Sequence, residues 1–145
     1  MDNSKVVMAW NLTSAASNLC QTLGYHRQNP LNIDDLTKTC RNNLFWTVYK
    51  LDKGLSLRLG RPSNIPEVEI SLPPDINEPR CVTVARIQGK IYDQLYSPMA
   101  LSRPDDCREE LAENLATEVQ DLIRKCKDEE LVRFKVYISE CTRIC

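Results

Sequence analysis

Side chains that could perform chemistry are few in this chain of 145 residues, and they lie far apart in the sequence. The one histidine, His26, would have to act as the base of any serine hydrolase, yet no Gly-x-Ser-x-Gly nucleophile turn is present. Three pairs of adjacent carboxylates occur near expected helix starts, where acidic groups interact favourably with the helix dipole. They are Asp34-Asp35, Asp105-Asp106 and Glu109-Glu110. We therefore predict that the chain is not an enzyme.

Two arginines and a group of aromatic residues could bind a ligand. Arg58 and Arg61 flank Gly60 and could hold an anion, although pairing with Asp52 or capping of helix-end carbonyls is the interpretation that we favour. The aromatic residues could stack on nucleic-acid bases, but no basic stripe accompanies them, so we expect them in the core and at helix contacts. They are Phe45, Trp46 and Tyr49.

The seven cysteines do not have the spacing of a metal site. No Cys-x-x-Cys pair occurs, and Cys141 and Cys145 form the only close pair. A tetrahedral zinc site would need a second pair. Four cysteines fall on the apolar phase of expected helices, and we predict that they are buried, reduced thiols; they are Cys20, Cys40, Cys107 and Cys126.

The composition is that of one ordinary globular domain. Nineteen basic and twenty acidic residues give a formal net charge of -1, without the basic excess that is typical of proteins that bind the DNA backbone. The N-terminus lacks the basic and apolar regions of an export signal, and we expect a soluble intracellular protein.

Four amphipathic helices are predicted from apolar residues that recur at steps of three and four. They cover about residues 6–23, 34–59, 82–96 and 102–126, and Gly24 and Gly60 are expected to end the first two. The first helix is predicted to bury Met8, Leu12, Ala15, Ala16, Leu19, Cys20 and Leu23. The second is predicted to be the structural centre, buried along Leu44, Val48 and Leu51.

The remaining segments are predicted to be extended. Residues 61–79 contain five prolines and are expected to form a structured connector that packs lightly along the helices. Residues 131–138 alternate in polarity like a β-strand, which has no partner in a helical chain. We predict an all-α fold, with amphipathic helices packed as a partial helical domain over residues 1–128 and an atypical C-terminal tail over 129–145.

Several runs of sequence resemble the fungal-specific transcription factor domain, the regulatory middle region of fungal zinc-cluster activators. These runs are residues 19–27 (LCQTLGYHR), 44–53 (LFWTVYKLDK), 55–62 (LSLRLGRP) and 85–98 (ARIQGKIYDQLYSP). The resemblance covers about residues 6–126. The residues that match the family motif are Leu23, Gly24, His26, Arg27, Leu44, Phe45, Trp46, Tyr49, Asp52, Arg58, Gly60, Arg61 and Pro62.

The resemblance implies an all-helical regulatory domain that acts in the nucleus and binds proteins of the transcription machinery or the rest of a longer regulator. In the family, a cluster of six cysteines binds zinc and reads DNA. That cluster is not found in this sequence, so we expect no cofactor or metal in this chain, only indirect contact with DNA and no contact with membranes. We also expect the sequence to represent a fragment of a longer regulator, a truncated gene product or an incomplete gene model.

Two functional hypotheses remain. The first is a regulatory and interaction domain of a fungal transcription factor, which modulates transcription without catalysis. The alternative is a small helical domain that senses a metabolite, in which Arg58 or Arg61 contacts an acidic ligand in an apolar pocket between helices.

Overall fold

A computed structural model describes residues 3–28, 33–72 and 80–125 of the protein, and most of these residues are helical. Its helices are α1 (Asn3–Thr22), α2 (Asp35–Leu59), α3 (Arg80–Ile91), α4 (Pro98–Leu101) and α5 (Asp105–Arg124). A 3₁₀ turn (η1, Glu67–Glu69) lies between α2 and α3, and a π-helical turn (η2, Tyr92–Tyr96) continues α3. These residues contain no β-strand, which confirms the predicted all-α fold class.

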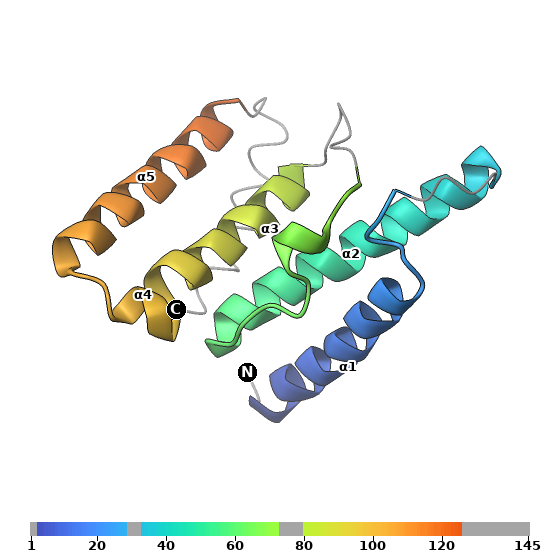
Figure 1. Ribbon diagram of the computed structural model, residues 1–145, viewed down its shortest axis with the longest axis horizontal. Coiled ribbons are helices and arrows are strands. Elements are labelled where there is room, and N and C mark those ends of the chain that lie inside the picture. Colours follow the sequence, from blue (N-terminus) through green and yellow to red (C-terminus); the bar gives the residue numbers. More distant parts are fainter. Residues whose placement is uncertain (1–2, 29–32, 73–79, 126–145) are drawn as a thin grey trace.

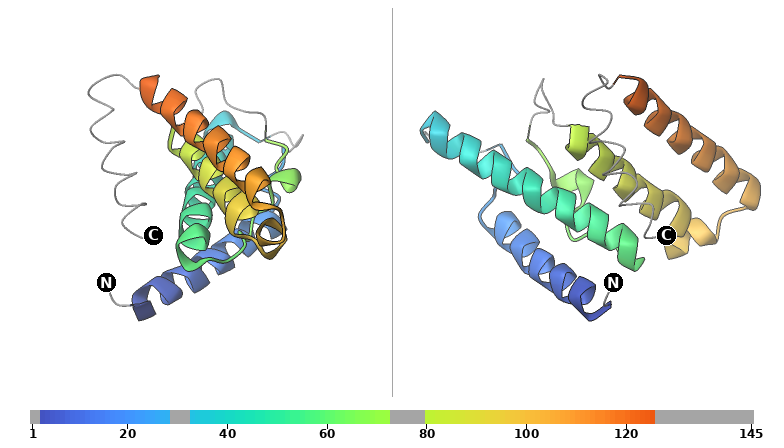
Figure 2. Two further views of the ribbon diagram at one scale, coloured as in Figure 1. Left: turned by 90° about the vertical axis from the view of Figure 1, so that its left-hand side faces the viewer. Right: turned by 180° about the vertical axis from the view of Figure 1, so that it is seen from behind.

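The four longer helices lie side by side in one layer, in the order α1, α2, α3, α5 (Figure 1). Each helix packs on its neighbour, and α2 lies between α1 and α3. Residues 61–72, which we call the connector, cross one side of this layer over α2 (Figures 1 and 2). Four helices in one layer leave the opposite side of α1 and α2 uncovered by another helix of the described part of the chain.

The ends of α2 follow local sequence signals. Asp34 caps the N-terminus by accepting a hydrogen bond from the backbone N–H of Thr37, at 3.0 Å. Gly60 ends the helix in the left-handed conformation, with φ of 61°, and Gly24 has φ of 72° at the end of α1. Both glycine stops were predicted, because only glycine adopts this conformation without steric cost.

The centre of the core lies between α2, the connector and α3. Phe45, Tyr49, Ile65, Val82 and Ala85 have no exposed surface, and Cys20 and Val48 complete the cluster. The predicted buried stripe on α2 is therefore wrong in two of its three residues: Val48 is buried, but Leu44 and Leu51 are 51% and 52% exposed. The contacts with α1, α3 and the connector select a different side of the helix, the one that carries Phe45, Val48, Tyr49, Asp52, Lys53 and Ser56.

The predicted apolar face of α1 also turns out to point mainly away from the core. Its exposed residues are Met8, Leu12, Leu19 and Leu23, and Ala15 is exposed as well. The buried residues are Val6, Thr13, Ser17 and Cys20, while Ala16 packs partly against the core. The side of α1 that faces α2 and the connector therefore carries mainly small and polar side chains.

The cysteine prediction is confirmed for Cys20 and wrong for two others. Burial raises the pKa of the Cys20 thiol above its ordinary value. Cys40 and Cys107 are exposed, because α2 and α5 contact their neighbours through other sides. Cys126 lies outside the described residues.

The two later predicted helices exist with small changes. Val84 and Ile87 on α3 and Leu115 on α5 are buried. The first of these helices ends in the π-helical turn η2 rather than in regular α-helix, and a short helix, α4, follows where none was predicted. Ser97 caps α4 and Pro98 begins it, which is the arrangement that these two residue types favour.

The connector contributes more to the core than was expected. Ile65 is completely buried, and Ile70 and Leu72 pack against the core cluster, whereas Val68 is 91% exposed. The predicted light packing is therefore wrong at Ile65. The remainder of the proline-rich stretch (73–79), the strand-like residues 131–138 and the boundary at residue 128 lie outside the described residues.

Candidate functional site

The most densely connected polar group of the chain surrounds Asp52, a motif residue in the second half of α2. Its carboxylate has no exposed surface and accepts hydrogen bonds from the backbone N–H groups of Asn64 (3.1 Å) and Ile65 (3.2 Å). It also accepts from Nδ2 of Asn64 (2.7 Å) and from the hydroxyl of Ser63. Four donors compensate the buried charge, so Asp52 fastens the start of the connector to α2.

A second group of ionic contacts centres on Glu67 in η1. The buried ammonium of Lys53 lies 3.3 Å from Oε1 of Glu67 and donates to the carbonyl of Ile65 at 2.8 Å. The hydroxyl of Tyr49 donates to the same carboxylate, and Nε of Arg86 on α3 lies 3.7 Å from its Oε2. Glu67 therefore joins α2, the connector and α3 through one carboxylate. We call Tyr49, Asp52, Lys53, Ser63, Asn64, Glu67 and Arg86 the Asp52 cluster.

The three predicted aromatic residues form one stack beside this cluster. Phe45 and Tyr49 each meet the Trp46 ring edge-on, with ring centroids 5.0 and 5.3 Å apart. The Arg86 guanidinium lies 5.6 Å from the Trp46 ring centroid. The expectation that these rings serve as core and helix-contact residues agrees with this geometry.

One asparagine links the connector to α1 as well. Nδ2 of Asn64 donates to the hydroxyl of Ser14 at 3.0 Å, and the Asn64 carbonyl accepts from Nε2 of Gln21 at 3.1 Å. Sequence reasoning missed Ser63, Asn64 and Glu67, because they were treated only as parts of a proline-rich connector. The signal available was their position directly after the motif residues Gly60, Arg61 and Pro62.

The two candidate anion-binding arginines, Arg58 and Arg61, lie at the C-terminal end of α2. The Arg61 guanidinium stacks on the Trp10 ring of α1 at 4.6 Å, and backbone N–H groups of Gly60 and Arg61 cap the carbonyls of Leu57 and Ser56. The expected pairing of Arg61 with Asp52 is therefore wrong, whereas the expected capping of a helix-end carbonyl is confirmed for Arg61 through its backbone N–H, which donates to Ser56. Arg58 is half-buried in the last turn of α2. The metabolite-sensing alternative stays a prediction.

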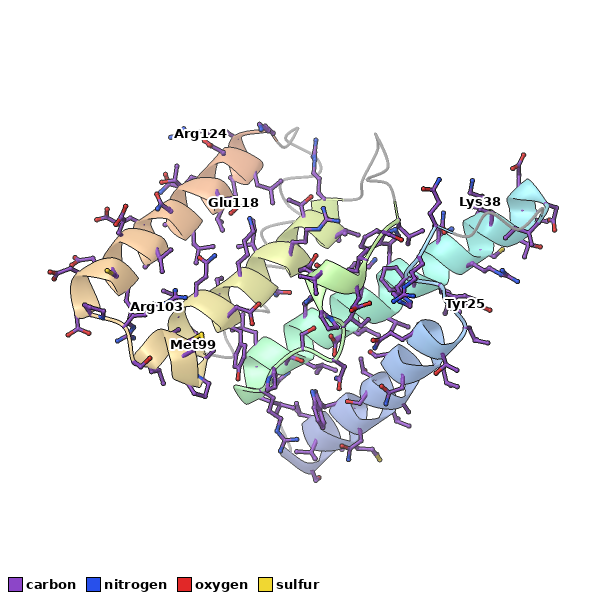
Figure 3. All side chains as sticks on the ribbon, viewed as in Figure 1. Tyr25, Lys38, Met99, Arg103, Glu118 and Arg124 are labelled. Atoms are coloured by element: carbon purple, nitrogen blue, oxygen red, sulfur yellow. The ribbon has the colours of Figure 1, made fainter. Side chains whose placement is uncertain are left out.

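The motif residues after α1 fasten the other end of the connector. His26 is buried, its carbonyl accepts from the backbone N–H of Ser71 at 3.1 Å, and Arg27 pairs with Glu69 at 2.7 Å. Tyr25 lies where the chain leaves α1 for α2 (Figure 3), and the Arg41 guanidinium is 5.3 Å from its ring centroid. Leu23, Leu44 and Pro62 are exposed and do not join either group.

The described residues contain no set of three or more His, Cys, Asp or Glu side chains placed to hold a metal ion. None of their helices is long and apolar enough to cross a lipid bilayer. The donors and acceptors of the Asp52 cluster bind one another and join α1, α2, α3 and the connector. The cluster therefore has a structural role.

Comparison of the sequence with known proteins finds a family and several relatives. The family model described as "Fungal specific transcription factor domain" matches residues 3–79. A transcriptional regulatory protein of Schizosaccharomyces pombe is 35% identical over 59% of this chain and 12% of its own length. Pyrimidine pathway regulatory protein 1 of Saccharomyces cerevisiae is 31% identical over 65% of this chain and 11% of its length.

A third relative is lactose regulatory protein LAC9 of Kluyveromyces lactis, which is 38% identical over 45% of this chain and 8% of its length. The chain thus spans about a tenth of the length of these curated relatives. No solved structure matches the chain significantly. The family model covers α1, α2, the connector and all members of the Asp52 cluster except Arg86. The chain therefore belongs to the fungal-specific transcription factor domain family.

Proposed function

We propose that this chain is a regulatory and interaction domain of a fungal transcription regulator, which acts in the nucleus through protein contacts and without catalysis. The observation that carries the proposal is the family match over residues 3–79, together with relatives that are named transcriptional regulatory proteins. The partners would be proteins of the transcription machinery or the remainder of a longer regulator.

The use of the motif residues supports a scaffold rather than an enzyme. Asp52 accepts four hydrogen bonds, and Tyr49 and Lys53 both bind Glu67, so these groups hold the connector in place. Groups that act as acids or bases need access to a substrate. Asp52 and Tyr49, by contrast, have no exposed surface.

The decisive experiment fuses the full chain to an unrelated DNA-binding domain in a fungal reporter strain. We expect reporter output to differ from that of the DNA-binding domain alone. The matched control is the same fusion with Phe45→Asp, which places a charge in the core and should remove the effect by unfolding the domain. Output equal to that of the bare DNA-binding domain, with the fusion present at normal level, would contradict the proposal.

We further propose that zinc binding and DNA reading belong to a different segment or to a partner. The cysteines are widely spaced, and the net charge is -1, which gives little phosphate neutralisation. Metal analysis of the purified chain should find no stoichiometric zinc. Titration with promoter and random duplexes should show weak binding that does not depend on sequence, and tight sequence-dependent binding at physiological salt would refute this part.

A further inference from the structure

The outer side of α1 and α2 carries two stripes of exposed large apolar side chains. On α1 and the turn directly after it the stripe is Met8, Leu12, Leu19 and Leu23, with exposed fractions of 57–67%. On α2 it is Leu36, Leu44 and Leu51, with exposed fractions of 51–74%. Spacings of four, seven and eight residues place each set along one side of its helix. We call these seven residues the α1–α2 apolar face.

The two stripes lie on the same side of the layer. Side chains turn by about 100° per residue in an α-helix. The α1 stripe is therefore roughly opposite Ser14 and Gln21, which contact the connector residue Asn64. On α2, Leu44 and Leu51 are likewise roughly opposite the connector-binding direction of Tyr49 and Lys53. Figure 2 (right) shows the molecule from this side, with α1 and α2 adjacent.

Helices α1 and α2 are antiparallel, so the start of each lies near the end of the other. The Arg61 guanidinium, just after α2, stacks on Trp10 near the start of α1, and Arg41 near the start of α2 stacks on Tyr25 just after α1. The two stripes thus run beside each other over most of their length. Exposed apolar surface of this extent on a globular domain is typical of a protein-binding site.

The charges of these two helices have one predominant sign. The sequence of α1 contains no acidic residue, and Asp35 in the first turn is the one acidic residue of α2 that is not buried. Lys5 continues the α1 stripe toward the N-terminus, and Arg58 continues the α2 stripe toward the C-terminus, so both basic groups lie at the same end of the face.

We propose that the α1–α2 apolar face docks an amphipathic helix of a partner protein whose polar side is acidic. An apolar helix face laid into a groove between two helices is a recurrent mode of recognition, and its charged rim selects the partner. The inference rests on the proposed function and names the surface and the chemistry of its partner.

Charge argues against two other occupants of the face. A second copy would bring a face whose own charges are Lys5 and Arg58 against the same face, which offers no carboxylate opposite these two basic groups. Helix α5 is strongly acidic, but its apolar residues Leu111, Leu115, Val119 and Leu122 lie on its buried and half-buried side, next to α3. It therefore has no free apolar stripe to offer.

The test uses a fluorescent 18-residue synthetic peptide with leucines at helical spacing and glutamates at its polar positions. Its control is the same peptide with lysines in place of the glutamates. Fluorescence anisotropy with the full chain should show binding of the glutamate peptide that is about tenfold or more tighter than that of the lysine peptide, and raising the salt should narrow the difference. No binding at millimolar concentration, or equal binding of both peptides, would overturn the proposal.

Variants locate the binding surface. Leu12→Ser combined with Leu44→Ser should weaken the glutamate peptide about tenfold or more, whereas Met99→Ser combined with Leu101→Ser, on the equally exposed α4, should leave its affinity unchanged (Figure 3). Circular dichroism checks that both double variants remain folded. Equal loss in both would refute the assignment, as would loss in neither.

Alkylation of cysteine thiols tests the location of the bound peptide by a second method, which does not depend on comparing affinities. The peptide should slow alkylation of the exposed thiol of Cys40 on α2 but not that of Cys107 on α5, as measured by peptide mapping. Sedimentation that shows a dimer of the chain abolished by Leu44→Ser would assign the face to a second copy and overturn the proposal. If the reporter fusion is active while the peptide fails to bind, the proposed function stands and this inference alone is wrong.

Discussion

At the scale of single residues, the protein buries the carboxylate of Asp52 and the ammonium of Lys53, which are neighbours in the sequence but bind different groups. Asp52 receives its four donors from residues 63–65, while Lys53 donates to the Ile65 carbonyl and pairs with Glu67. Buried charges are costly unless hydrogen bonds compensate them. The compensation here comes mainly from the backbone and short side chains of the connector, so the connector path and the two charges depend on each other.

Replacing Asp52 by alanine should strongly destabilise the fold. The change removes the acceptor of two backbone N–H groups, an amide and a hydroxyl, and the expected loss is about 3–5 kcal/mol in the free energy of unfolding. Urea denaturation measures it. Asp93→Ala, at an exposed position in η2, is the control and should change stability by less than about 0.5 kcal/mol. Equal midpoints for the two variants would contradict the role given to Asp52.

Asp34 should make stability depend on pH at the start of α2. Hydrogen bonds from Thr37 lower the pKa of the Asp34 carboxyl below its ordinary value. Its contribution is therefore fully present above the ordinary aspartate pKa and is lost as the pH falls through the lowered value.

The matched variant for this effect is Asp34→Asn, which keeps an N-cap acceptor that does not titrate. The melting temperature of the natural chain should fall relative to that of Asp34→Asn as the pH drops through the ordinary aspartate range and below. Parallel melting curves of the two proteins across this range would argue against the capping role.

At the scale of elements, α2 is the helix on which the fold depends, through a different side from the one its leucines indicate. Phe45 is fully buried and Leu51 is half-exposed. Phe45→Ala should therefore cost about 3–5 kcal/mol, while Leu51→Ala should cost less than about 1 kcal/mol. Thermal and urea melts of the two variants measure the difference. A larger loss of unfolding free energy for Leu51→Ala than for Phe45→Ala would support the buried stripe that was predicted from the sequence.

Gly89 of α3 lies in close contact with Lys53 of α2. A Cβ atom built there would lie 3.1 Å from Cδ of Lys53, whereas one at Gly54 would meet only Oε1 of Gln88, at an ordinary 3.6 Å. Glycine costs about 1 kcal/mol relative to alanine inside a helix. Gly54→Ala should thus stabilise the fold by about that amount, and Gly89→Ala should fail to do so because Lys53 is held by Ile65. An equal gain for both in denaturation experiments would show that Lys53 can move aside at no cost.

At the scale of the whole molecule, the four longer helices form an open layer rather than a closed bundle. Helix α2 has neighbours on both sides and the connector across it, whereas α5 packs on α3 and η2 and buries only Leu115 fully among its described residues. The ion pair of Glu118 on α5 with Lys90 on α3 lies at the surface, at 2.7 Å (Figure 3), and adds little stability.

Amide hydrogen exchange should therefore differ between these helices. The amides of α5 should open at a lower free energy than those in the centre of α2, because local opening costs less where fewer apolar side chains are buried. Native-state exchange followed by mass spectrometry compares the two helices directly. Uniform protection across α2 and α5 would indicate one cooperative unit and contradict the expectation.

The parts of the fold that depend on neighbouring residues in the chain could be predicted. The helix class, the approximate bounds of α1, α2, α3 and α5 and the stops at Gly24 and Gly60 follow from periodicity, caps and backbone conformation. The motif led to Tyr49 and Asp52 but not to Ser63, Asn64 or Glu67. Residues 11 to 18 positions apart along the chain meet there, and the position of Ser63, Asn64 and Glu67 after the motif residues does not tell which side chains of α2 they contact.

The sequence by itself determined that the chain is helical, approximately where its four longer helices lie, and which family its motif resembles. Only the tertiary structure decided which side of each helix is buried, because that choice depends on the surfaces of all neighbours at once. Small and polar residues on α1 allow close packing beneath the connector, and the buried charges of α2 find their partners only there. The leucines of both helices are left on the outer side, where they form the apolar face.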